Sequence, residues 1–202
     1  TLALAYAETH PERASEIILR GIFILREREI RWFYQEGASR IFPDAWEKFV
    51  EPIPEAERGD LLRAYHARLT GEDAATRLAC ARAWSVWEAW TSTLHPNEEL
   101  LSQMGRDEFA LAFARIECHY FLNQGFFQSE AQLLDGVARI RQVPGVIVQG
   151  RYDVVCPMET AWALHRAWPE AELIVAQTAG HSAFDPEITH HLLTATDRFA
   201  AR

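Results

Sequence analysis

An aspartate and a histidine follow two strand-like runs in the last quarter of the chain, and these residue types in this order can carry out hydrolysis. The run 146–148 leads into Gly150-Arg151-Tyr152-Asp153, and the run 173–175 leads into Gly180-His181-Ser182. A histidine accepts a proton from a serine hydroxyl when a carboxylate holds its other ring nitrogen. The pattern therefore predicts that Asp153 orients His181 as a general base, although each residue taken alone also fits a turn aspartate or a surface histidine.

The nucleophile that would complete such a triad is not found in its usual motif. In enzymes that carry the acid and the histidine on successive strand ends, the serine lies in a G-x-S-x-G turn between a strand and a helix. None of the seven serines and none of the cysteines occupies this motif, whereas residues 1–7 resemble the helix that follows it. We therefore expect the C-terminal part of a serine hydrolase, whose nucleophile precedes Thr1 and which is inactive alone.

The elements that must position these residues fall into three zones. Residues 1–9 are helix-like and 15–21 are predicted to form a short buried strand closed by glycine, whereas apolar residues recur at helical spacing over 26–139. After Pro144, strands and helices alternate again. This order predicts the α/β class, with an α/β-hydrolase fold that lacks its first strands and carries a large all-helical lid between sheet strands. The expected core segments are 1–25 and 140–202, the expected lid is 26–139, and the expected helices are 43–50, 54–69, 72–91, 107–121, 130–138, 157–168 and 186–200.

Composition excludes several other classes of protein. A formal charge of −9 and a pI near 5.4, with Lys48 as the single lysine, disfavour a nucleic-acid partner. No apolar run approaches the roughly 18 residues that a membrane span requires, and residues 1–9 do not have the pattern of a signal peptide. Three widely spaced cysteines outside any C-x-x-C motif favour a reducing compartment, with the cytoplasm as the expected location. His190-His191 has no third ligand at suitable spacing, so no metal site is expected.

Several strings together resemble the prolyl aminopeptidase (proline iminopeptidase) family, and the likeness covers essentially the whole chain. The strings are Ile18 to Phe23, Gly37 to Arg40, Trp84 to Glu88, Phe109 to Glu117, Gly150 to Asp153 and Gly180 to Ser182. The resemblance implies an α/β-hydrolase that removes N-terminal proline from peptides through an acyl-enzyme on serine. It also implies that the enzyme uses neither a metal nor an organic cofactor.

Two lid glutamates are candidates for binding the terminal amine of a peptide. Glu88 lies among Trp84, Trp87 and Trp90, and Glu117 follows Ile116, so both carboxylates interrupt helix faces that look buried. Carboxylates in an apolar pocket can hold an ammonium group by charge-assisted hydrogen bonds. The alternative is that both are exposed helical glutamates and that the tryptophans form the lid core. The resemblance implies the amine-binding role at these two positions.

The resemblance also implies contacts to the proline ring. Phe23 and Phe33, with Trp32 adjacent, match the ring-contacting positions of the family, although position 33 is Phe where a Tyr is expected. Cys156 resembles a family cysteine near the proline pocket, or it is a small buried loop residue. Arg20 either orients the lid glutamates or pairs with a structural carboxylate.

Two other functional interpretations of the sequence stay open. Another lidded α/β-hydrolase, such as an esterase or a dehalogenase, would share the aspartate and histidine loops but not the amine site. A non-catalytic binding homologue would use the lid pocket without chemistry. The sequence does not predict an oligomeric state.

Overall fold

The computed structural model describes residues 1–201 and divides the chain into two compact units. The sheet unit comprises Thr1–Ile24 and the chain from Phe127 onward, and the helical unit comprises Leu25–Phe126. The lid limits predicted from the sequence, 26–139, extend further toward the C-terminus than the helical unit does.

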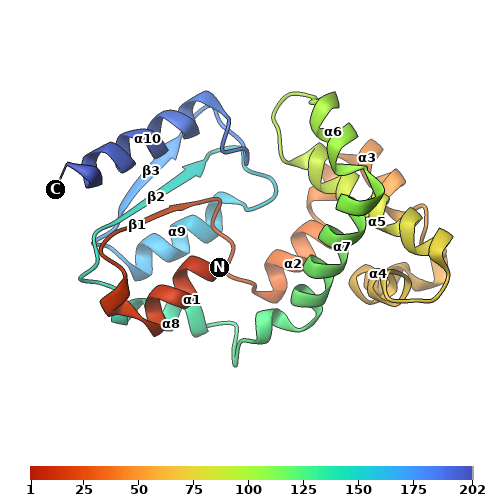
Figure 1. Ribbon diagram of the computed structural model, residues 1–202, viewed down its shortest axis with the longest axis horizontal. Coiled ribbons are helices and arrows are strands. Elements are labelled where there is room, and N and C mark those ends of the chain that lie inside the picture. The colour runs from red at the N-terminus through yellow and green to blue at the C-terminus, as the bar shows by residue number, and fades with distance from the viewer. Residues whose placement is uncertain (202) are drawn as a thin grey trace. The chain divides into compact units, whose positions relative to one another are not determined.

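The sheet unit contains three parallel strands in the order β1-β2-β3 (Figure 1). They are β1 (Ile17–Arg20), β2 (Gly145–Gly150) and β3 (Glu172–Ala176). Ile17 lies opposite Gly145, and Val146 lies opposite Glu172. All six residues of β2 are buried, as expected for a central parallel strand that is covered on both faces. Because the strands are parallel, their carboxyl ends meet at one edge of the sheet.

Helices cover both faces of this sheet (Figure 1). On one face, Leu4, Leu133 and Leu164 pack with Ile147 of β2. On the other face, Ile188 packs with Val146 and Val148. The helical elements of this unit are α1 (Leu2–Thr9), η1 (Pro11–Arg13), α8 (Gln132–Gly136), η5 (Val137–Arg139), α9 (Met158–Ala167) and α10 (Pro186–Ala200).

The helical unit is built around a core of aromatic side chains. Trp84, Trp87, Phe49 and Tyr65 are almost completely buried, and the Tyr65 hydroxyl donates to the Phe49 carbonyl. Trp84 and Trp87 of the tryptophan stripe predicted as lid core therefore belong to the packed interior of this unit, whereas Trp90 is half-buried. Its elements are α2 (Glu27–Tyr34), η2 (Ala38–Arg40), α3 (Pro43–Val50), η3 (Glu55–Asp60), α4 (Leu61–Leu69), α5 (Ala74–Thr91), α6 (Glu98–Met104), α7 (Asp107–Leu122) and η4 (Gln124–Phe126).

Local signals explain where several of these helices begin. The Asp73 carboxylate accepts hydrogen bonds from the backbone amides of Ala75 and Thr76. The Thr76 side chain, followed by these amides, lowers the pKa of Asp73. Helix α10 begins with Pro186 at its first position, where a missing N–H costs no helical hydrogen bond. None of the helices within residues 1–201 has both the length and the apolar character that crossing a membrane would need.

Both ends of the helical unit have unusual backbone. The non-glycine residues with positive φ among the described residues are Leu25, Gln124 and Phe126, and Gly125 between the last two is also positive. A left-handed conformation costs roughly 1–2 kcal/mol for a residue with a Cβ. Local strain is therefore concentrated where the chain enters and leaves this unit.

Candidate active site

Asp153 and His181 lie on the loops that follow β2 and β3, and their side chains meet at the carboxyl edge of the sheet. Nδ1 of His181 lies 3.0 Å from Oδ2 and 3.1 Å from Oδ1 of Asp153. The Asp153 side chain is 1% exposed and that of His181 is 19% exposed. Because its Nδ1 faces an acceptor, the neutral imidazole carries its proton on Nδ1 and leaves Nε2 to accept another. This arrangement can perform general base catalysis on a nucleophile placed at Nε2.

The Asp153 carboxylate is held by donors from its own strand and loop. The Cys156 amide donates to Oδ1 at 2.8 Å, and the Gln149 side-chain amide donates to Oδ2 at 3.0 Å. The structure thus brings three of the expected residues into contact, since Cys156 holds Asp153 through its backbone. The Cys156 residue is 7% exposed. Gln149 is not among the site residues predicted from the sequence.

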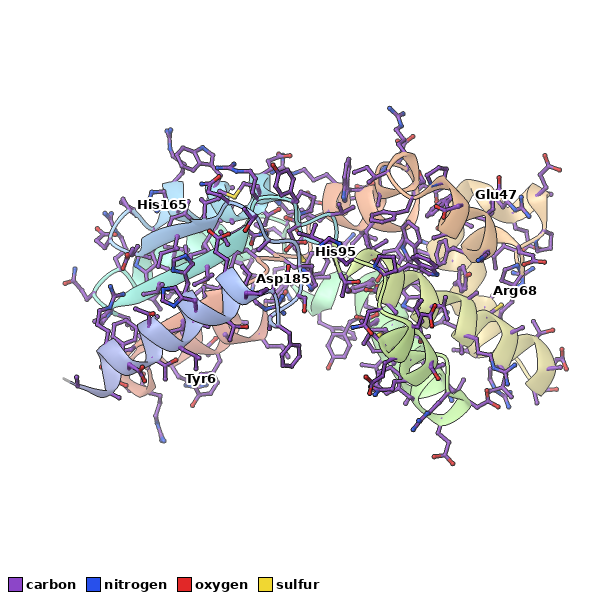
Figure 2. The ribbon with its side chains drawn as sticks, turned by 90° about the horizontal axis from the view of Figure 1, so that it is seen from above. Tyr6, Glu47, Arg68, His95, His165 and Asp185 are labelled. Atoms are coloured by element: carbon purple, nitrogen blue, oxygen red, sulfur yellow. The ribbon has the colours of Figure 1, made fainter. Side chains whose placement is uncertain are left out.

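The histidine loop is held by contacts from three directions. The Asp185 carboxylate, labelled in Figure 2, accepts a hydrogen bond from the Gly180 amide at 2.7 Å. The Arg20 guanidinium donates to the His181 carbonyl, a partner that differs from both partners expected for it. Gly21 has a φ of +55°, and a Cβ there would lie 3.0 Å from His181 Cε1. A glycine at position 21 therefore suits both the turn after β1 and the space that the imidazole occupies.

The two glutamates of the helical unit each receive a hydrogen bond from an aromatic side chain. The Tyr34 hydroxyl donates to Oε1 of Glu88, and Nε1 of Trp84 donates to Oε2 of Glu117 at 3.0 Å. The rings of Tyr34 and Trp84 stack with centroids 4.3 Å apart. Glu88 is 7% exposed, whereas Glu117 is half-buried. The two carboxyl groups are therefore held by a stacked aromatic pair that the sequence analysis did not identify as part of a site.

Burial makes these carboxyl groups poor acids. The pKa of Glu88 is raised well above its ordinary value by burial and by the neighbouring Glu117 carboxylate, against the opposing hydrogen bond from Tyr34. Burial raises the pKa of Glu117 to about 7, against the opposing hydrogen bond from Trp84. Within residues 1–201, neither carboxyl group forms an ion pair with an arginine, lysine or histidine. A cation that reached both oxygens would supply the missing countercharge.

The aromatic residues expected to contact a proline ring belong to different units. Phe33 is 3% exposed and packs against Tyr34 and Trp87, with centroid distances of 4.8 Å and 5.5 Å. Trp32 is half-buried beside Gly37. Phe23 belongs to the sheet unit, where its carbonyl accepts a hydrogen bond from the Thr1 hydroxyl at 2.5 Å. Phe33 is thus part of the packed interior of the helical unit, whereas Trp32 and Phe23 keep some exposed surface.

Metal-binding side chains do not cluster in the described part of the chain. No three His, Cys, Asp or Glu side chains within residues 1–201 gather as a metal site would require. His190 and His191 lie next to each other on α10, with ring centroids 5.2 Å apart.

The chain belongs to the alpha/beta hydrolase fold family, whose model matches residues 1–187. Among named proteins, it is 58% identical over 199 residues to the proline iminopeptidase of Xylella fastidiosa strain Temecula1, covering 98% of this chain and 64% of that one. It is 60% identical over 202 residues to the probable proline iminopeptidase of Leptolyngbya boryana, covering 100% of this chain and 63% of that one. The proline iminopeptidase of Arabidopsis thaliana is 54% identical over 202 residues, with 100% and 53% covered. The chain therefore spans less than two thirds of the length of these relatives.

Proposed function

We propose that this chain forms the acid–base and amine-binding part of a serine exopeptidase that releases N-terminal proline from peptides. The observation that carries the proposal is the Asp153–His181 hydrogen-bonded pair at the carboxyl edge of a parallel sheet. Identities of 54–60% to three proline iminopeptidases support the choice of substrate.

In the proposed mechanism, His181 moves a proton twice. Nε2 of His181 takes the proton of a serine hydroxyl as the serine oxygen attacks the carbonyl carbon of the terminal proline. The resulting imidazolium is stabilised by Asp153, and it then protonates the departing peptide amine. Water attacks the prolyl ester by the same route in reverse, releasing proline and restoring the serine.

The proposed mechanism requires a nucleophilic serine that is not among these 202 residues. None of the seven serines stands in a G-x-S-x-G motif, the turn that presents the nucleophile in this class of hydrolase. The 202-residue chain alone is accordingly expected to release no proline from a substrate.

Glu88 and Glu117 are proposed to bind the ammonium group of the substrate. Glu88 is buried and Glu117 is half-buried, and burial raises both pKa values because it disfavours the charged form. A positively charged group bound between the two carboxyl groups would favour their ionised forms and offset this cost. A terminal proline amine is a secondary ammonium with two N–H donors, which matches two acceptors. Phe23 and Trp32, which keep some exposed surface, are proposed to contact the proline ring, with Cys156 near it, whereas Phe33 is buried in the interior of the helical unit.

The amine-binding role can be tested with the protein in the length that its gene encodes. The assay compares hydrolysis of proline 4-nitroanilide with that of 4-nitrophenyl acetate for the wild type, Glu88→Gln and Glu117→Gln. A hydrogen bond to a charged group contributes about 1.5–3 kcal/mol, so kcat/KM for the amide should fall about 10- to 100-fold in each variant while the ester rate stays unchanged. Glu108→Gln, at an exposed position on α7, is the matched control and should leave both rates unchanged.

Two outcomes would argue against the proposal. If both glutamine variants hydrolyse the amide at the wild-type rate, the protein is better described as an esterase-like member of the family. If the purified 202-residue chain, verified by intact mass, releases proline rapidly, the nucleophile lies within it and the proposed assignment is wrong.

A further inference from the structure

Gln149 is a completely buried polar side chain in an otherwise apolar strand. It lies in β2 between Val148 and Gly150 and has 0% of its surface exposed. Its carbonyl oxygen accepts from the Ile22 amide at 3.1 Å, and its Nε2 donates to Oδ2 of Asp153 at 3.0 Å and to the Cys156 carbonyl at 2.8 Å. Both amide hydrogens and the carbonyl oxygen are therefore used without any help from solvent.

Two backbone groups determine which way this amide points. The Ile22 N–H can only donate, so it must face the carbonyl oxygen of Gln149. The Cys156 carbonyl can only accept, so it must face Nε2. With these two ends assigned, the second Nε2 hydrogen is directed at Asp153. Gln149 is thus an obligatory donor to the carboxylate, and the assignment does not depend on the charge of Asp153.

The same amide also links the two loops that adjoin His181. Ile22 follows Gly21, whose backbone lies against the imidazole, and Cys156 closes the loop that carries Asp153. The donor at Oδ2 and the Cys156 amide at Oδ1 restrict rotation of the carboxylate about its Cβ–Cγ bond. Rotation of that group would take its oxygens away from Nδ1 of His181.

We propose that Gln149 is a positioning residue of this site, one that holds the Asp153 carboxylate toward His181 and ties it to the loop after β1. The inference rests on the proposed function only in assuming that the Asp153–His181 pair works as a base. Gln149 does not touch substrate in this proposal, and it acts through Asp153.

Nuclear magnetic resonance of the labelled 202-residue chain tests the inference without any need for turnover. In the wild type, the Nε2 hydrogens of Gln149 should exchange slowly with water, because both are buried and bonded. Asp153→Ala should speed that exchange and move the signal of one Nε2 hydrogen upfield, because that hydrogen loses its acceptor. Rapid exchange of both hydrogens in the folded wild type, or no response to Asp153→Ala, would overturn the proposal.

A variant of Gln149 supplies the complementary measurement. The Nδ1 hydrogen of a histidine bonded to a carboxylate gives a low-field proton signal, which is assigned here by its absence in His181→Ala. Gln149→Met should weaken this signal or shift it upfield, because Oδ2 loses its donor and only the Cys156 amide at Oδ1 still restricts rotation of the carboxylate. Gln35→Met is the matched control, since Gln35 also bridges two backbone groups, the Arg58 carbonyl and the Leu61 amide, but lies in the helical unit.

The outcomes separate a positioning role from a general contribution to folding. A changed signal in Gln149→Met with an unchanged signal in Gln35→Met supports the proposal. An unchanged signal in folded Gln149→Met, or an equal change in both variants, overturns it. If Gln149→Met does not fold, the wild-type and Asp153→Ala measurements decide the matter. Failure of the proposed peptidase activity would appear in the hydrolysis assay and would leave these signals unaffected.

Discussion

Replacing Glu117 by glutamine should make the helical unit more stable at pH 8 and should leave its stability unchanged at pH 4. Burial raises the pKa of this carboxyl group from 4.5 to about 7, so folding favours its protonated form. Each pKa unit corresponds to about 1.4 kcal/mol, and this rise therefore corresponds to about 3 kcal/mol at full burial. Because Glu117 is half-buried, solvent screening reduces the expected effect to about 2 kcal/mol.

The pH window follows from the direction of the shift. Below pH 4.5 the carboxyl group is protonated in both the folded and the unfolded chain, and it has no effect on the difference between them. Between pH 4.5 and 7 the folded chain keeps a proton that the unfolded chain has lost, so the free energy of unfolding falls as pH rises. Glutamine does not titrate and can still accept the hydrogen bond from Trp84. The free energy of unfolding of Glu117→Gln should therefore not fall between pH 4.5 and 7.

Urea unfolding followed by tryptophan fluorescence at pH 4, 6 and 8 measures the effect. The signal reports mainly on the helical unit, which contains Trp32, Trp46, Trp84, Trp87 and Trp90. Glu108→Gln, at an exposed position on the same helix, is the control and should behave like the wild type. Equal pH dependence of the unfolding free energy in wild type and Glu117→Gln would refute the reasoning.

Three further substitutions test other parts of the structure. Burial also raises the pKa of Glu8 to about 7, so Glu8→Gln should raise the free energy of unfolding by up to about 3 kcal/mol at pH 8 and not at pH 4; a gain of equal size at both pH values would contradict this. In Gly150→Ala the new Cβ would lie 1.9 Å from the Gly180 carbonyl oxygen, and a clash between two backbone segments should cost about 3 kcal/mol or more in urea unfolding followed by circular dichroism. Wild-type stability of Gly150→Ala would show that the two loops are not packed as described. Gln124 is exposed and has a φ of +51°, a conformation that glycine adopts without strain, so Gln124→Gly should stabilise the chain by up to about 1 kcal/mol. A loss of stability would mean that the glutamine side chain stabilises the fold by more than the backbone strain costs.

The sequence predicted the elements that carry strong periodic or punctuating signals. Pro43 and Pro186 mark the first residues of α3 and α10, and the predicted helix 186–200 matches α10 at both ends. The two apolar runs 146–148 and 173–175 lie within β2 and β3. Because parallel strands end at a common edge, the order of Asp153 and His181 was enough to expect them near each other.

The elements that the sequence analysis missed have weaker or unusual signals. At the start of helix α2, the Glu29 carboxylate accepts the Arg26 backbone amide at 3.0 Å and pairs with the Arg26 guanidinium at 2.7 Å. This is only half of a capping box, because arginine has no acceptor with which to replace the usual serine or threonine. Helix α6 has only seven residues, few enough to be taken for a connecting segment. The predicted helix 130–138 is instead the five-residue α8 followed by the 3-10 helix η5, with the backbone of Gly136 close to the Glu8 carboxylate.

The site residues that were missed depend on contacts between distant parts of the sequence. Tyr34 and Glu88 are 54 positions apart, and nothing in the local pattern around either residue connects them. Position 33 is Phe and has no hydroxyl, whereas the next residue, Tyr34, has one, and it donates to Glu88. Gln149 did offer a signal, because a lone amide in a strand buried on both faces must find several hydrogen-bond partners.

The central claim is tested most directly by the rate at which the gene-length protein releases 4-nitroaniline from proline 4-nitroanilide and from its N-acetylated form. The proposed mechanism requires both a free amine on the substrate and His181 as the base. We therefore expect rapid hydrolysis of the free-amine substrate, negligible hydrolysis of the acetylated one, and a fall of at least about 10⁴-fold in kcat for His181→Ala. Equal hydrolysis of both substrates, or near wild-type turnover by His181→Ala, would contradict it.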